Sequence, residues 1–107
     1  GKARAMQMIM LGERIGAQQA MDWGMIYKAV PDDQLMAEAR GLAQRLAAGP
    51  TRALGLMRQG LARALEQTYA EGMATEASHQ AQAVQTADSA EGARSFVERR
   101  KPAFKGE

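Results

Sequence analysis

The spacing of apolar positions follows a helical period along almost the whole chain. Over 32–48, leucine or alanine recurs every three or four residues, and leucine and methionine repeat that pattern after Pro50. Gly12, Gly24 and the Gly49-Pro50 pair interrupt it, as helix-ending residues do. We therefore expect helices over 3–11, 17–23, 32–48, from Pro50 past Leu65, over 68–86, and from 88 to near Pro102. Residues 25–30 are predicted to form an extended connector.

Three of the predicted helices begin at residues that favour a helix N-terminus. Asp32 is a good N-cap for the third helix. Thr68 and Glu71 have the spacing of a capping box, in which each side chain bonds the backbone N–H of the other residue. Asp88 and Glu91 repeat that spacing before the last helix.

The helices offer little apolar surface for a core. The 68–86 helix carries only four candidate core residues among its glutamines and alanines, namely Tyr69, Met73, Ala77 and Val84. No convincing pair of strands is present, so the predicted fold is all-α, with about six helices. The thin apolar face indicates packing against another domain or subunit. Since the first residue is glycine, we also expect the sequence to be a piece of a longer one.

The composition excludes several kinds of active site. The absence of cysteine excludes disulfides, thiolate metal sites and a cysteine nucleophile. His79 is the only histidine, so no histidine metal cluster can form, and no nucleophile or acid is spaced to work with it. Glu71 and Glu76 point away from each other on their helix. No apolar run is long enough for a membrane span or a leader peptide, and a cytoplasmic protein is expected.

The charge is unevenly distributed, although the net charge is only +2. Residues 68–93 hold four acids and no lysine or arginine, whereas 94–107 hold five cations against two acids. Positive charge confined to one tip argues against a nucleic-acid interface, which needs many phosphate contacts. The cations at 99–101 could complement the negative end of the last helix. Alternatively, with Phe96 anchoring the helix, they could bind a phosphate.

Three stretches, taken together, resemble a known family. "LGERIGAQQAMDWGMI" at 11–26, "LAAGPTRALGLMRQGL" at 46–61 and "DSAEGARSFVERRKPAFKG" at 88–106 occur in the order and spacing found in the C-terminal third of the enoyl-CoA hydratase/isomerase (crotonase) superfamily. Within it, "DWGMI" and "AAGPTRALGLMRQGL" are most similar to the phenylacetate-pathway isomerases that act on epoxidised phenylacetyl-CoA.

The resemblance implies that 1–107 form the helical C-terminal domain of a crotonase-like enzyme, without its catalytic α/β core. In that family, two backbone N–H groups of the core stabilise an enolate-like oxyanion of the thioester, and acidic residues move protons. The resemblance places no catalytic residue in this chain and implies no metal or prosthetic group, with coenzyme A entering as part of the substrate. The helical region would cover the active site and build a trimer interface.

The resemblance also implies a binding role for the last helix. A cation there helps to bind the phosphates of coenzyme A held mainly by a neighbouring subunit, and the matching position is Arg99, with Lys101 as a weaker contact. An arginine keeps the charge of the family's lysine and adds a bidentate fork. An aromatic residue used by family hydratases falls on Gln80, so that contact is not expected. The alternative hypothesis is a helical oligomerisation module without chemistry.

Overall fold

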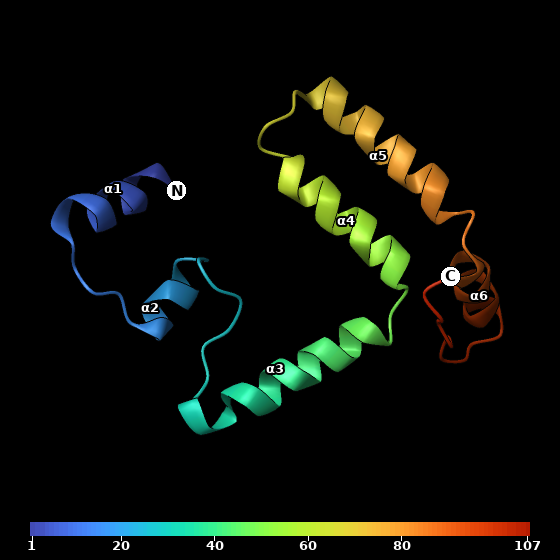
Figure 1. Cartoon of the computed structure of the whole chain (residues 1–107), viewed down its shortest axis with the longest axis horizontal. Coiled ribbons are helices and arrows are strands. Elements are labelled where there is room, and N and C mark those ends of the chain that lie inside the picture. The colour runs from blue at the N-terminus through green and yellow to red at the C-terminus, as the bar shows by residue number, and fades with distance from the viewer. The chain divides into compact units, whose positions relative to one another are not determined.

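The computed structural model describes all residues from 1 to 107, and six helices account for all of its regular secondary structure (Figure 1). In chain order they are α1 (Lys2–Leu11), α2 (Ala17–Asp22), α3 (Asp32–Ala47), α4 (Thr51–Arg63), α5 (Tyr69–Ala83) and α6 (Ala87–Val97). The prediction of an all-α chain with about six helices is confirmed. No helix has both the length and the apolar character needed to cross a membrane.

The chain divides into two compact units, Gly1–Met36 and Ala37–Glu107, with the division inside α3. In the first unit, α1 ends at Gly12, whose φ of 64° is the left-handed conformation that glycine adopts without strain. The Arg4 guanidinium lies 5.3 Å from the centre of the Trp23 ring and donates to the Trp23 carbonyl oxygen at 3.2 Å. These two contacts tie α1 to the end of α2.

In the second unit, α4 and α5 pack against each other, joined by the loop before Thr68 (Figure 1). The predicted capping box is confirmed: the Thr68 Oγ1 accepts from the Glu71 N–H at 3.4 Å, and the Glu71 carboxylate accepts from the Thr68 N–H at 2.8 Å. These bonds to Thr68, the backbone bond first, lower the pKa of Glu71. Gly60 of α4 faces His79 of α5 across this contact, and a Cβ at Gly60 would lie 3.6 Å from Nδ1 of His79, an ordinary van der Waals distance.

Two of the predicted helix starts are wrong in detail. Asp32 is the first residue of α3 and not its N-cap. Asp88 and Glu91 do not cap α6; Thr86 does so, accepting from the Ser89 N–H at 3.1 Å. The last helix also ends at Val97, earlier than Pro102 requires.

No hydrophobic side chain is buried, and the three buried residues are polar: Thr86, Asp88 and Ser95. The predicted apolar face of α4 is open at Leu61, which is 76% exposed. The helix ends at Arg63, before the predicted Leu65, and Leu65 is fully exposed in the loop that follows. The apolar face of α5 is open as well, including Tyr69 and Met73. The physical reason is that only one helix pair packs extensively, so most apolar faces have no partner within the chain.

Candidate functional site

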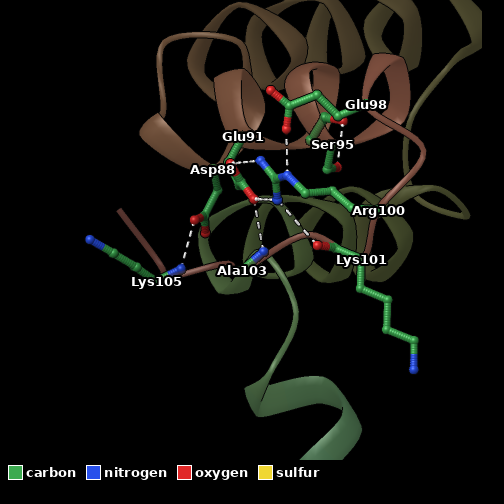
Figure 2. Close-up of polar contacts among 9 residues, drawn as sticks. Asp88, Glu91, Ser95, Glu98, Arg100, Lys101, Ala103 and Lys105 are labelled. Atoms are coloured by element: carbon green, nitrogen blue, oxygen red, sulfur yellow. Dashed lines mark hydrogen bonds and ion pairs between the residues drawn. The ribbon is translucent and has the colours of Figure 1, made fainter.

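The segment after α6 folds back along the helix and is held by two carboxylates of α6, those of Asp88 and Glu91 (Figure 2). Asp88 accepts from the backbone N–H groups of Lys105 and Gly106 at 2.7 and 2.8 Å, and its own N–H donates to the Glu107 carbonyl at 3.1 Å. Residues 99–107 are called the C-terminal tail below. Asp88 is 3% exposed, so its carboxylate depends on these bonds for the hydrogen bonds that water would otherwise supply.

One turn further along α6, Glu91 binds the start of the C-terminal tail (Figure 2). Its two oxygens accept from Nη1 and Nη2 of Arg100 at 2.5 and 2.9 Å, which is the bidentate geometry of an arginine–carboxylate pair. One of those oxygens also accepts from the Ala103 N–H at 2.9 Å. Arg100 Nε donates to Glu98 at 2.5 Å, and its Nη1 reaches the Lys101 carbonyl oxygen at 3.2 Å.

The turn between α6 and the C-terminal tail is a Schellman motif with arginine at the left-handed position. Arg99 has a φ of 53°, and is the only residue other than glycine with a positive φ. The Arg99 N–H donates to the Phe96 carbonyl, and the Arg100 N–H donates to the Ser95 carbonyl. Glycine usually takes this position, and a side chain there costs about 1 kcal/mol.

The structure therefore separates the three consecutive cations. Arg100 donates four of its five N–H groups to Glu91, Glu98 and the Lys101 carbonyl oxygen. The side chains of Arg99 and Lys101 are exposed and make no hydrogen bond or ion pair within the chain. The Lys101 side chain extends away from the cluster (Figure 2). Of the residues singled out from the sequence, Arg99 and Lys101 thus remain the two cations open to a ligand.

Phe96 does not anchor the last helix within this chain, although the phosphate-binding alternative had given it that role. Its side chain is 86% exposed, and Val97 beside it is 80% exposed. The face of α6 that packs carries Asp88, Glu91 and Ser95, because the C-terminal tail binds there through polar groups. Phe104 of the tail lies over Gly92, where a Cβ would be 3.7 Å from its ring.

The charge of Glu91 is strongly favoured by its surroundings. Hydrogen bonds from Arg100, and secondly from the Ala103 N–H, lower the pKa of Glu91 from 4.5 to about 2. Hydrogen bonds to Glu91, and secondly to Glu98, raise the pKa of Arg100. Both groups therefore remain charged throughout the physiological pH range.

Acid is expected to loosen the C-terminal tail. Because the folded pKa of Glu91 lies below its usual value, its stabilisation is complete above about pH 4.5 and is lost as pH falls toward 2. Hydrogen exchange at the Ala103 amide, followed across this range, should speed up beyond the intrinsic pH effect. A Glu91→Gln protein should lack that excess, and equal profiles for the two proteins would contradict the assignment.

A second feature is an apolar groove between α4 and α5 with a volume of about 650 Å³. The exposed side chains of Met57, Leu61, Tyr69 and Met73 line it. Its volume falls in the range of small-molecule sites. A groove of this kind also forms between two amphipathic helices whose apolar faces are not covered by a third element. Gln80 lines the same groove.

Neither the turn after α6 nor the α4–α5 groove contains a recognisable set of catalytic side chains. His79 is half-buried against Gly60 and forms no hydrogen bond, and no group of three or more histidine, cysteine or acidic side chains is placed to hold a metal ion. What the chain presents is a pair of open cations on a braced turn and an open apolar groove. These features fit binding and packing.

Sequence reasoning missed the roles of Asp88 and Glu91. Their spacing matched a local capping box, whereas their partners lie from 9 to 18 residues further along the chain. The one available signal was a pair of acids followed by a cation-rich segment with Pro102, since proline at that point ends a helix and lets the chain turn back.

Comparison with known proteins identifies the family. The family model for enoyl-CoA hydratase/isomerase matches residues 1–107. The chain is 40% identical to the 1,2-epoxyphenylacetyl-CoA isomerase of Escherichia coli over 99% of its length and 40% of that protein. It is 38% identical to a probable enoyl-CoA hydratase of Rhodobacter capsulatus, over 99% of the chain and 41% of the relative.

Solved structures agree with this result. An enoyl-CoA hydratase subunit from Geobacillus kaustophilus superposes with a TM-score of 0.93 at 33% identity, covering 98% of this chain and 41% of the other. The enoyl-CoA hydratase of Bacillus anthracis gives a TM-score of 0.89 at 30% identity, over 97% and 40%. The chain thus spans about two fifths of the length of its relatives, and its six helices are those of the crotonase fold's C-terminal region. It belongs to the enoyl-CoA hydratase/isomerase family.

Proposed function

We propose that this chain is the C-terminal helical part of an enzyme that acts on acyl-CoA thioesters by hydration or isomerisation. The support is that the family model and the relatives match along essentially the whole chain, and that these relatives are named as enzymes of CoA thioesters. Coenzyme A would enter as part of the substrate. A free-standing oligomerisation module has less support, because it leaves that similarity unexplained.

Within the family, an isomerase of epoxidised phenylacetyl-CoA is the branch that we favour. The identity of 40% with the Escherichia coli isomerase extends over 106 residues. Gln80 stands where the family's hydratases have an aromatic residue, and this difference favours an enzyme other than a simple hydratase. The Gln80 side chain lines the α4–α5 groove.

We further propose that Arg99, with Lys101 as a weaker contact, binds the phosphates of coenzyme A. This assignment rests on a difference among the three consecutive cations. Arg100 is paired with Glu91 and Glu98, while the side chains of Arg99 and Lys101 have no partner. A guanidinium at the outside of a turn, directly after the C-cap of a helix, can present its fork to a phosphate.

The open groove is proposed to receive the remainder of the same enzyme. The chain accounts for 40% of the length of the Escherichia coli isomerase, so 60% of that relative lies outside the match and is available to cover apolar faces. A trimer in which this region borders a neighbouring subunit would use the exposed residues Phe96 and Val97 as well. On this view the 107 residues alone are expected to be inactive.

Replacing Arg99 tests the binding assignment in the full enzyme. Arg99→Ala is expected to raise KM for the acyl-CoA substrate about tenfold, the equivalent of about 1.4 kcal/mol, and to leave kcat within about twofold. The reason is that the contact lies far from the bond chemistry and acts equally on ground and transition states.

Two variants serve as controls for this substitution. Arg99→Lys keeps the charge and should retain most of the affinity, whereas Lys101→Ala should raise KM by a smaller factor than Arg99→Ala. An unchanged KM for Arg99→Ala would return Arg99 to the role of a helix-end cation that complements the dipole.

A further inference from the structure

The residues on either side of Arg99 are joined to each other. Glu98 precedes it and Arg100 follows it, and their side chains meet at 2.5 Å. Arg99 therefore occupies the apex of a closed turn, with its own φ at 53°. An arginine in an unbraced chain would leave this conformation readily, because a side chain makes it unfavourable.

The stretch around Lys101 is held at both of its ends by a single carboxylate (Figure 2). Glu91 binds the Arg100 guanidinium at 2.5 and 2.9 Å and the Ala103 N–H at 2.9 Å. Between these two anchor points lie only Lys101 and Pro102, and proline has no N–H and a fixed φ. The backbone that carries Lys101 is thus closed into a short bracket.

We propose that Glu91 and Arg100 are positioning residues that hold Arg99 and Lys101 in the geometry that binds an anionic phosphate group. The proposal rests on the proposed role of Arg99 in binding coenzyme A. Two cations whose backbone is held in a braced turn lose less conformational entropy on binding than the same cations on a free tail. Removing the brace should therefore weaken binding although neither Glu91 nor Arg100 touches the ligand.

Asp88 and Glu91 of α6 bind different parts of the C-terminal tail. Asp88 fixes the far end through Lys105 and Gly106, whereas Glu91 fixes the near end beside the open cations. Loss of the near contact alone should leave residues 105–107 attached. A binding defect that arises from Glu91 can hence be separated from general detachment of the tail.

The test compares Glu91→Gln, Arg99→Ala and the double variant in the full enzyme, with coenzyme A as the probe in calorimetry. Glu91→Gln is expected to raise Kd about fivefold, with kcat for the acyl-CoA substrate within about twofold. If Glu91 acts through Arg99, Arg99→Ala will have a smaller effect in the Glu91→Gln background than alone. Hydrogen exchange should speed up at Ala103 and stay slow at Lys105 and Gly106.

A second variant keeps the test independent of how well Glu91→Gln folds. Arg100→Lys retains the charge but cannot form the bidentate fork, and it should reproduce the rise in Kd. Glu98→Gln, which leaves the Glu91 fork intact, should have a smaller effect than either.

The outcomes separate the two proposals. If Arg99→Ala weakens binding but Glu91→Gln and Arg100→Lys do not, or if the effects of Glu91→Gln and Arg99→Ala multiply, the positioning role is overturned and the binding role of Arg99 stands. If Arg99→Ala leaves the Kd for coenzyme A unchanged, the binding role itself fails, and the positioning role fails with it.

Discussion

Substituting aspartate for Leu61 is expected to prevent correct assembly of the full enzyme. Leu61 is 76% exposed in this chain and lines the α4–α5 groove, which we propose is covered by the rest of the protein. The substitution would forfeit the burial of a leucine, about 1.5–3 kcal/mol, and would bury an unpaired carboxylate at a cost of several kcal/mol more. Together these losses approach the whole stability of a typical domain.

Ala62 provides the matched control on the same helix, because it is exposed and does not line the groove. Ala62→Asp introduces the same charge one position away and should change little. Light scattering after size-exclusion chromatography, with soluble yield beside it, would compare the two proteins. If Leu61→Asp gives an oligomer with the same mass and melting temperature as Ala62→Asp, the groove is not an interface in the assembled enzyme.

The second large effect is expected at Asp88. Asp88→Ala removes the acceptor of the Lys105 and Gly106 N–H groups, held at 2.7 and 2.8 Å. A donor left without a partner costs about 1–3 kcal/mol when it is shielded from water, so two such donors should lower the free energy of opening of the tail by about 2–6 kcal/mol. Release of the tail to water would keep the loss toward the lower value.

Hydrogen exchange over residues 103–107 measures this opening directly. Asp88→Asn retains one acceptor oxygen and should lie between wild type and Asp88→Ala. Glu98→Ala, at the exposed C-cap of α6, should leave exchange at Gly106 unaltered. Protection at Lys105 and Gly106 that survives in Asp88→Ala would show that other contacts hold the tail.

The tail is also shaped by its own backbone. Gly106 has a φ of 79°, and a Cβ at this residue would lie 2.5 Å from the Thr51 Oγ1 at the start of α4. Only glycine satisfies both conditions, because the first disfavours any side chain and the second leaves no room for one. The end of the tail therefore has a fixed course past α4, which supports the separate role given to Asp88.

The helices could be predicted because their signals are local. The Thr68–Glu71 capping box joins residues three apart, and Gly12 ends α1 through its own conformation. The bonds of Asp88 and Glu91 with the tail could not be predicted in this way, because they depend on how the chain turns after Val97. The spacing of these acids favoured a cap, and the hydroxyl of Thr86 supplied it instead.

The binding residues show the same division between local and distant information. Arg99 was singled out by resemblance to a motif, and its role in binding remains a prediction. The sequence contained no indication that Arg100 is paired and its neighbours are open, since all three cations are adjacent and similar. Only the position of Glu91, nine residues before Arg100, distinguishes them.

With the binding role proposed for Arg99, its left-handed conformation sets stability and activity in competition at a single position. Glycine or asparagine would fit the turn with less strain, so a selection for thermal stability alone should favour losing the arginine. Selection for turnover at low substrate concentration should favour keeping it. A stabilised variant of this enzyme obtained by heat challenge would thus need its substrate affinity checked, even if every substitution lay far from the chemistry.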